Sequence, residues 1–167
     1  MVDRIFLNYS VRKLTQAAGR VEECLGRLTE EQIWARGSAN ENAVGNLVLH
    51  LCGNIHQWLL SGVGGEEFNR DRDGEFAARH TGLNLRSRLR ETVDRAVPII
   101  ERQTPDDLQR RIHVQQYEIA VLEAIYHVVE HFAGHAGQII FATKMLTGDD
   151  LGFYKHLKYS AHTEKTP

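Results

Sequence analysis

Residues 126–140 read Tyr126-His127-Val128-Val129-Glu130-His131-Phe132-Ala133-Gly134-His135-Ala136-Gly137-Gln138-Ile139-Ile140. Apolar side chains recur every seven residues through and beyond this stretch, at Ile125, Phe132, Ile139 and Leu146. Such a repeat is typical of a helix that packs its apolar stripe against other helices. The stretch therefore predicts a helix from about Glu118 to Leu146, the longest helical pattern in the chain.

The same stretch carries histidines at intervals of four, His127, His131 and His135. A step of four residues turns only about 40° around a helix, so neighbouring histidines lie one turn apart on nearly the same face. Two imidazoles spaced in this way are a common metal-ligand pair, as in zinc-binding helices. We predict that His131 and His135 bind a metal ion; the alternative is a hydrogen-bonded network of buried histidines. His127 lies about 80° from His135, which favours a place beside the site or at the surface.

A third ligand is predicted on another helix, which we expect to begin at an Asn42 cap. Its apolar face includes Leu47, and His50 follows three residues later at the border of the core. Taken alone, His50 is better explained as a hydrogen-bonded residue at the core edge. With a histidine pair available opposite, the ligand interpretation becomes the better one. Candidates for groups that support the ligand rings are Asn54, His127, Glu130 and Gln138.

Two further amphipathic helices are expected, at about residues 3–27 and 81–102. Pro98 should kink or loosen the second of these. Residues 111–115 look extended or irregular, and no strand pattern appears in the chain. These features predict an all-α fold, a four-helix bundle.

The connections complete this organisation. Short helical turns are predicted after Thr29 and Thr104, which begin helix-start patterns. Residues 64–79 form a polar loop that makes a long crossover between the second and third helices; such loops are often functional, and a solvated connection is the alternative. We expect one domain at residues 1–150 and a tail at residues 151–167.

Composition is that of an ordinary globular domain. The chain has 167 residues, 42% of them hydrophobic and 25% charged, and a net charge of −2. No global field therefore favours nucleic acid or an anionic membrane, and no apolar run approaches the length of a membrane span. Cys24 and Cys52 follow apolar helical patterns without a CxxC partner. This predicts buried thiols in a reducing, cytoplasmic environment.

Two motifs resemble those of the DinB/YfiT-like family. One is Asn42-Ala43-Val44-Gly45-Asn46-Leu47-Val48-Leu49-His50-Leu51-Cys52-Gly53-Asn54 with Trp58 following, and the other is His131-Phe132-Ala133-Gly134-His135-Ala136-Gly137-Gln138-Ile139. The resemblance implies an up-down-down-up four-helix bundle, commonly a homodimer. It also implies that His50, His131 and His135 are the metal-binding histidine triad, with zinc or nickel as the expected ion.

Three imidazoles without a fourth protein ligand leave an open coordination position, as catalytic zinc sites do. We therefore expect a divalent-metal-dependent enzyme in which the metal activates a thiol or a water molecule. The resemblance favours a thiol-dependent transferase that takes a low-molecular-weight thiol. The alternatives are a metal-dependent hydrolase, a non-catalytic metal-binding, stress-related dimer, and a purely structural bundle.

Overall fold

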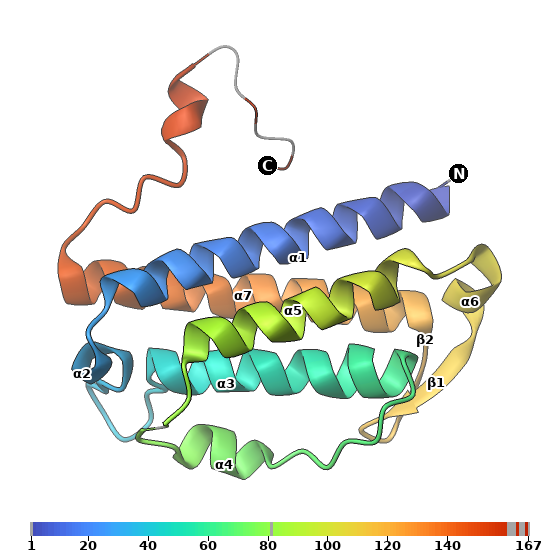
Figure 1. The fold of residues 1–167 in the computed structure, drawn as a ribbon, viewed down its shortest axis with the longest axis horizontal. Helices are drawn as coiled ribbons and strands as arrows, with labels where there is room; N and C mark the ends of the chain where they lie inside the picture. Colours follow the sequence, from blue (N-terminus) through green and yellow to red (C-terminus); the bar gives the residue numbers. More distant parts are fainter. Residues whose placement is uncertain (1, 81, 160–162, 164–165, 167) are drawn as a thin grey trace.

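The computed structural model describes residues 2–80, 82–159, 163 and 166, and it is mostly helical. Its long elements are α1 (Val2–Arg27), α3 (Val44–Ile55), α5 (Leu85–Glu101) and α7 (Val121–Thr147). These helices run side by side, with α1 packed on α5 and α7 and with α3 packed on the same two helices (Figure 1). The predicted helical class is confirmed.

The core lies where the stripes of the long helices meet. Ile125, Phe132 and Ile139 of α7 are buried as their seven-residue spacing predicts, whereas Leu146 at the end of that repeat is 38% exposed. Complete burial of a side chain as large as Phe132 contributes about 2–3 kcal/mol. The partners from the other helices include Leu14 of α1 and Leu51 of α3, both fully buried in the same cluster.

Two short helices begin as their sequences predict. Thr29 and Gln32 exchange hydrogen bonds in a capping box at the start of α2 (Glu30–Ile33). Thr104 caps α6 (Pro105–Gln109) by accepting a hydrogen bond from the backbone of Asp107, with proline at the first helical position. These local sequence patterns are enough to predict where the two helices begin, because each cap satisfies backbone groups of its own helix independently of the rest of the fold.

Other helix boundaries differ from the prediction. α3 begins at Val44 after Ala43, so Asn42 is not its cap. The side chain of Asn46 takes part in this start instead, because its Oδ1 accepts a hydrogen bond from the Ala43 N–H at 3.2 Å. α5 begins after an Asn84 cap, later than expected, and continues through Pro98 to Glu101.

A small antiparallel hairpin lies between α6 and α7, where the sequence indicated no strand. Strands β1 (Arg111–Val114) and β2 (Tyr117–Ala120) pair with Arg111 opposite Ala120 and Val114 opposite Tyr117. α7 consequently begins at Val121 and not at Glu118. The strands are only four residues long, and their turn, Gln115-Gln116, lacks the Asn-Gly or Asp-Gly pair that usually marks a hairpin.

The crossover between α3 and α5 is more ordered than a polar loop. α3 continues into the π-helical segment η1 (His56–Val63), and the chain then returns along α3 through the short helix α4 (Arg72–Ala77) (Figure 1). The buried amide of Asn46 holds α4 against α3 by donating to the carbonyl oxygens of Glu75 at 2.8 Å and Ala78 at 2.9 Å. This contact brings the crossover alongside His50.

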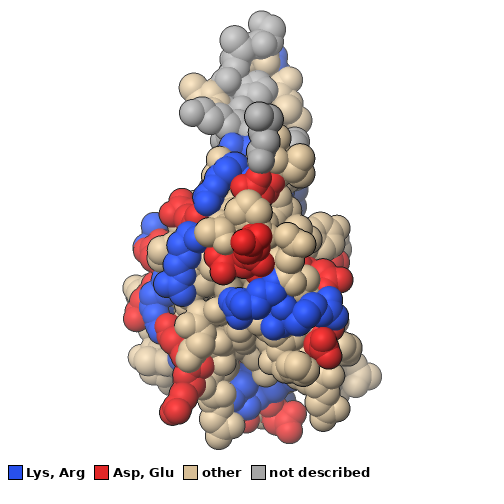
Figure 2. Space-filling model, turned by 90° about the vertical axis from the view of Figure 1, so that its right-hand side faces the viewer, with Lys and Arg blue, Asp and Glu red and all other residues tan. Residues whose placement is uncertain are grey.

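After α7, the tail contains η2 (Lys155–Lys158) and buries Leu151. Figure 2 looks onto the end of the molecule that lies on the right in Figure 1, and there acidic and basic side chains are interspersed. Among the helices of the described residues, none combines the length and the apolar character needed to cross a bilayer.

Candidate metal centre

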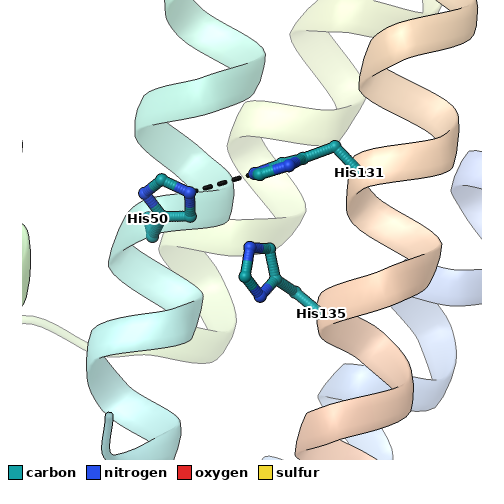
Figure 3. A group of neighbouring side chains, drawn as sticks. All are labelled: His50, His131 and His135. Carbon is teal, nitrogen blue, oxygen red and sulfur yellow. Dashed lines mark hydrogen bonds between the residues drawn. The ribbon is translucent and has the colours of Figure 1, made fainter. Parts of the chain in front are cut away.

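The structure brings three histidine rings together from two helices. His50 extends from α3, and His131 and His135 extend toward it from successive turns of α7 (Figure 3). Each ring offers one nitrogen such that the three nitrogens lie within 4.8 Å of one another. The four-residue spacing on α7 and the single histidine at the core edge of α3 therefore produce the cluster that the sequence predicts.

The spacing of the His50 and His131 ring nitrogens suits a metal ion. His50 Nε2 and His131 Nε2 are 3.0 Å apart. Two nitrogens bound to one zinc at 2.0–2.1 Å are separated by about 2.9 Å at a right angle and by about 3.3 Å at the tetrahedral angle. His135 turns its Nδ1 toward the side-chain oxygen of Gln138 at 2.7 Å, which leaves its Nε2 for the same position. The donor set fits a first-row divalent ion.

A carboxylate from the crossover holds the outer side of the His50 ring. Glu75 Oε2 lies 3.1 Å from His50 Nδ1, and the side chains are 11% and 5% exposed. Arg70 donates two hydrogen bonds to the same carboxylate, from Nε to Oε1 at 2.7 Å and from Nη2 to Oε2 at 2.8 Å. Burial raises the pKa of Glu75, but the hydrogen bonds from His50 and Arg70 outweigh it and hold the pKa below its usual value. Glu75 is therefore an anion at neutral pH.

The two clustered histidines of α7, His131 and His135, are neutral at physiological pH. Burial, followed by the repulsion of His135 and His50, lowers the pKa of His131 from 6.5 to about 4. Burial also lowers the pKa of His135, against the hydrogen bond to Gln138. A neutral imidazole has a free nitrogen lone pair, which is the form that binds a metal ion.

His127 lies next to the cluster and outside it. Its ring stacks on His131 at 5.5 Å between centroids and lies tilted against Trp58 at 4.5 Å. Burial lowers the pKa of His127, and the nearby charge of Glu130 opposes that effect. His127 therefore forms an aromatic wall beside the candidate metal position, close to where its helical angle predicts it.

The predicted supporting groups have different outcomes. Gln138 contacts His135, as described above. Asn54 is buried on α3 and Glu130 is exposed on α7, and neither has a hydrogen bond to the three rings among the described residues. The residues that contact His50 are instead Glu75 and Arg70. Sequence reasoning missed both. The only signal was the polar crossover itself, because no local pattern indicates which of its charges folds back onto α3.

The comparisons identify a family. Residues 2–157 match a family described as "Protein of unknown function (DUF1572)". The chain belongs to this family. None of the curated proteins compared with it matches.

Among the solved structures that share the fold of this DUF1572 protein is one from a bacterium. It is described as the crystal structure of the conserved protein of locus from Enterococcus faecalis, and it aligns with a TM-score of 0.67 at 14% sequence identity. The alignment covers 84% of this chain and 96% of that chain. At this identity the likeness concerns the fold alone.

Proposed function

We propose that His50, His131 and His135 hold a divalent metal ion, zinc or nickel, and that this protein is a metal-dependent enzyme. The observation that carries the proposal is the convergence of three imidazole nitrogens from two helices within 4.8 Å. Three neutral ligands leave room for a further ligand from solution. When bound, such an ion would act as a Lewis acid that activates a thiol or a water molecule.

We also infer that the four long helices form a bundle of the DinB/YfiT-like type with up-down-down-up topology. The helix directions in Figure 1 support this, because α1 and α7 run one way and α3 and α5 run the other way. The two sequence motifs of that family carry the three clustered histidines. The inferred homodimer rests on the resemblance alone.

The residues around the triad suggest how a substrate would approach. His50 is buried against the crossover, whereas His131 and His135 are only partly buried. A small molecule would therefore enter from the α7 side of the cluster, past the wall formed by His127 and Trp58. The imidazoles bring no negative charge of their own, and Arg70 compensates the charge of Glu75. An anionic group such as a thiolate suits this environment.

Metal content is the first test. We expect the purified protein to hold about one zinc or nickel ion per chain and His135→Ala to hold only traces, because two imidazoles bind far less tightly than three. His113→Ala is the matched control, since His113 is an exposed histidine in the hairpin and its loss should leave the metal content unchanged. A wild-type protein that takes up neither metal when both are offered would overturn the proposal.

Turnover is the second test. The metal-loaded protein should transfer a low-molecular-weight thiol to an electrophile, and a chelator or His135→Ala should stop the reaction. Chelator-sensitive hydrolysis of ester or amide substrates without any thiol requirement would favour the alternative hydrolase. Tight metal binding without turnover of either kind would favour the non-catalytic, stress-related dimer and contradict the enzyme assignment.

A further inference from the structure

His50 is held from the crossover as well as from its own helix. The ring nitrogen that faces away from the metal position, Nδ1, lies 3.1 Å from Glu75 Oε2 and 3.0 Å from Arg70 Nη2. Arg70 and Glu75 come from the segment that folds back along α3, and both side chains are almost completely buried. A charged pair enclosed this deeply is fixed in place, because leaving either partner alone would strand a buried charge.

The hydrogen bonds around His50 Nδ1 indicate which of its two ring nitrogens carries a proton. Arg70 Nη2 carries two hydrogens, and two oxygens accept from it: Glu75 Oε2 at 2.8 Å and the His50 carbonyl at 3.2 Å. A guanidinium has no acceptor, and an ionised carboxylate has no donor. The remaining contact, between Nδ1 and Oε2, therefore requires the proton on Nδ1. An imidazole that binds a metal ion is neutral and carries only one such proton, so in that form His50 Nε2 presents its lone pair to the side where His131 and His135 lie.

Gly53 supplies an independent sign that α3 is shaped around this pair. It follows His50 by three residues on the same helix, and a Cβ at this position would collide with Glu75 Oε1 and approach Arg70 Nε to 2.8 Å. Glycine in a helix interior costs roughly 0.5–1 kcal/mol relative to alanine. Here it leaves the space in which the pair lies against the helix.

We infer that Glu75, braced by Arg70 in the groove beside Gly53, is the positioning residue of the metal site, because it fixes His50 in the Nδ1-protonated tautomer and aims Nε2 at the metal position. The role rests on the proposed metal function. Carboxylates that hydrogen-bond to a ligand histidine orient the ring and raise its basicity, and their removal typically weakens metal binding 10–100-fold.

The first test uses the metal-free wild-type protein with 15N-labelled histidine. NMR should show His50 with its proton on Nδ1 and a bare Nε2. His50 protonated on Nε2 in the folded protein would overturn the inference. This measurement needs no metal and no variant, so it remains decisive even if metal uptake fails and the proposed function with it.

The second test measures zinc affinity by competition with a chromophoric chelator. Glu75→Gln should bind zinc 10–100-fold more weakly than the wild type and should show a mixture of His50 tautomers, since an amide can donate to Nδ1 as well as accept from it. The matched control is Glu66→Gln. Glu66 contacts a histidine, His56, and an arginine, Arg95, but His56 is not in the cluster. Equal affinities in the two variants would overturn the inference.

A third variant separates positioning from charge. Gly53→Ala changes no hydrogen-bonding group, yet its methyl group should displace the Glu75–Arg70 pair and lower zinc affinity in the same direction as Glu75→Gln. Gly19→Ala is the control, because a Cβ at Gly19 of α1 meets no atom within 4 Å. Wild-type affinity in a folded Gly53→Ala protein would contradict the assigned groove.

Discussion

The two cysteines are both buried, Cys24 on α1 and Cys52 on α3. Cys52 follows His50 by two residues on α3, but its thiol is buried and burial raises its pKa to about 11. Burial also raises the pKa of Cys24 on α1. A thiol with a raised pKa holds almost no thiolate at neutral pH, so any nucleophilic sulfur at the proposed metal site must come from the solution.

Thiol labelling checks this expectation. Iodoacetamide should modify neither Cys24 nor Cys52 in the native protein, and it should modify both after unfolding in urea. Mass spectrometry of the two samples gives the answer. Rapid alkylation of Cys52 in the folded state would show that α3 opens easily and that the chain has a nucleophile of its own.

His131 makes the stability of the metal-free protein dependent on pH. Its pKa in the folded state is about 4, against an ordinary value of 6.5. Above pH 6.5 the ring is neutral in the folded and unfolded chain alike, and its full contribution is present. As the pH falls from 6.5 toward 4, the unfolded chain takes up the proton and the folded chain resists it, so the free energy of unfolding decreases.

Urea unfolding of chelator-treated protein at pH 7.5 and pH 5 measures this decrease. His131→Gln should lose less stability over that interval than the wild type does, because the variant has no proton to gain at this position. His113→Gln, which alters an exposed histidine, should keep the wild-type decrease. The same pH dependence in all three proteins would mean that His131 is not the responsible group.

At the scale of elements, the side chain of Gln115 connects the hairpin to the proposed metal site. Gln115 and Gln116 have φ values of 50° and 69°, a left-handed conformation that favours glycine. Gln115 nevertheless reaches back to donate a hydrogen bond to Gln57 at 2.6 Å, and Gln57 in turn accepts from Arg70 at 2.8 Å. The strained residue is thus the outer end of a chain that leads to His50.

Glycine substitutions test the two turn positions separately. Gln115→Gly and Gln116→Gly should both relieve strain and leave stability equal or up to about 1 kcal/mol higher. Only Gln115→Gly breaks the link to Gln57, so only this variant should weaken zinc binding, by a few-fold. Zinc titration of both proteins makes the comparison, and an identical affinity would show that the hairpin does not influence the site.

Sequence reasoning predicted the elements unevenly, for physical reasons. The stripe around Phe132 and the caps at Thr29 and Thr104 depend on residues a few positions apart, so periodicity and capping rules found them. The hairpin is stabilised by burying Ile112 and Val114, and a four-residue strand is too short to show its alternation. The start of α3 was predicted wrongly. Capping rules favoured Asn42, which precedes the helix, whereas the side chain that bonds to the Ala43 N–H belongs to Asn46, inside the helix.

The residues of the candidate site were also predicted only where the signal is local in sequence. His131 and His135 share a face because of their helical spacing, and His50 stood out as a histidine beside a core position. Glu75 and Arg70 could not be found in this way, since their contacts with His50 span 25 and 20 residues and depend on how the crossover folds back. Local spacing predicts groups on one element, and it does not predict which charges another element will bring.

At the scale of the whole molecule, a metal ion at the triad would cross-link α3 to α7. His50 and His131 are 81 residues apart in the chain, so the unfolded chain cannot hold the same three ligands together at little entropic cost. Zinc at 100 times its dissociation constant should therefore raise the free energy of unfolding by about 2.7 kcal/mol.

Thermal unfolding with and without zinc measures this stabilisation. The wild-type midpoint should rise by about 5–11 °C for a domain of this size. His50→Ala should show no increase, whereas His113→Ala should behave as the wild type does. An equal rise in His50→Ala would mean that zinc binds elsewhere on the folded chain.

The return of the crossover along α3 has a consequence for anyone who redesigns or compares such chains. A variant in which Arg70 and Glu75 are both replaced by alanine would retain the length of the crossover, every proposed ligand and both motifs, and simple inspection would classify it as metal-competent. Without the buried anion behind His50, that ring would be free to rotate and to place its proton on either nitrogen. Counting histidines would then overestimate the affinity of this variant for the metal ion.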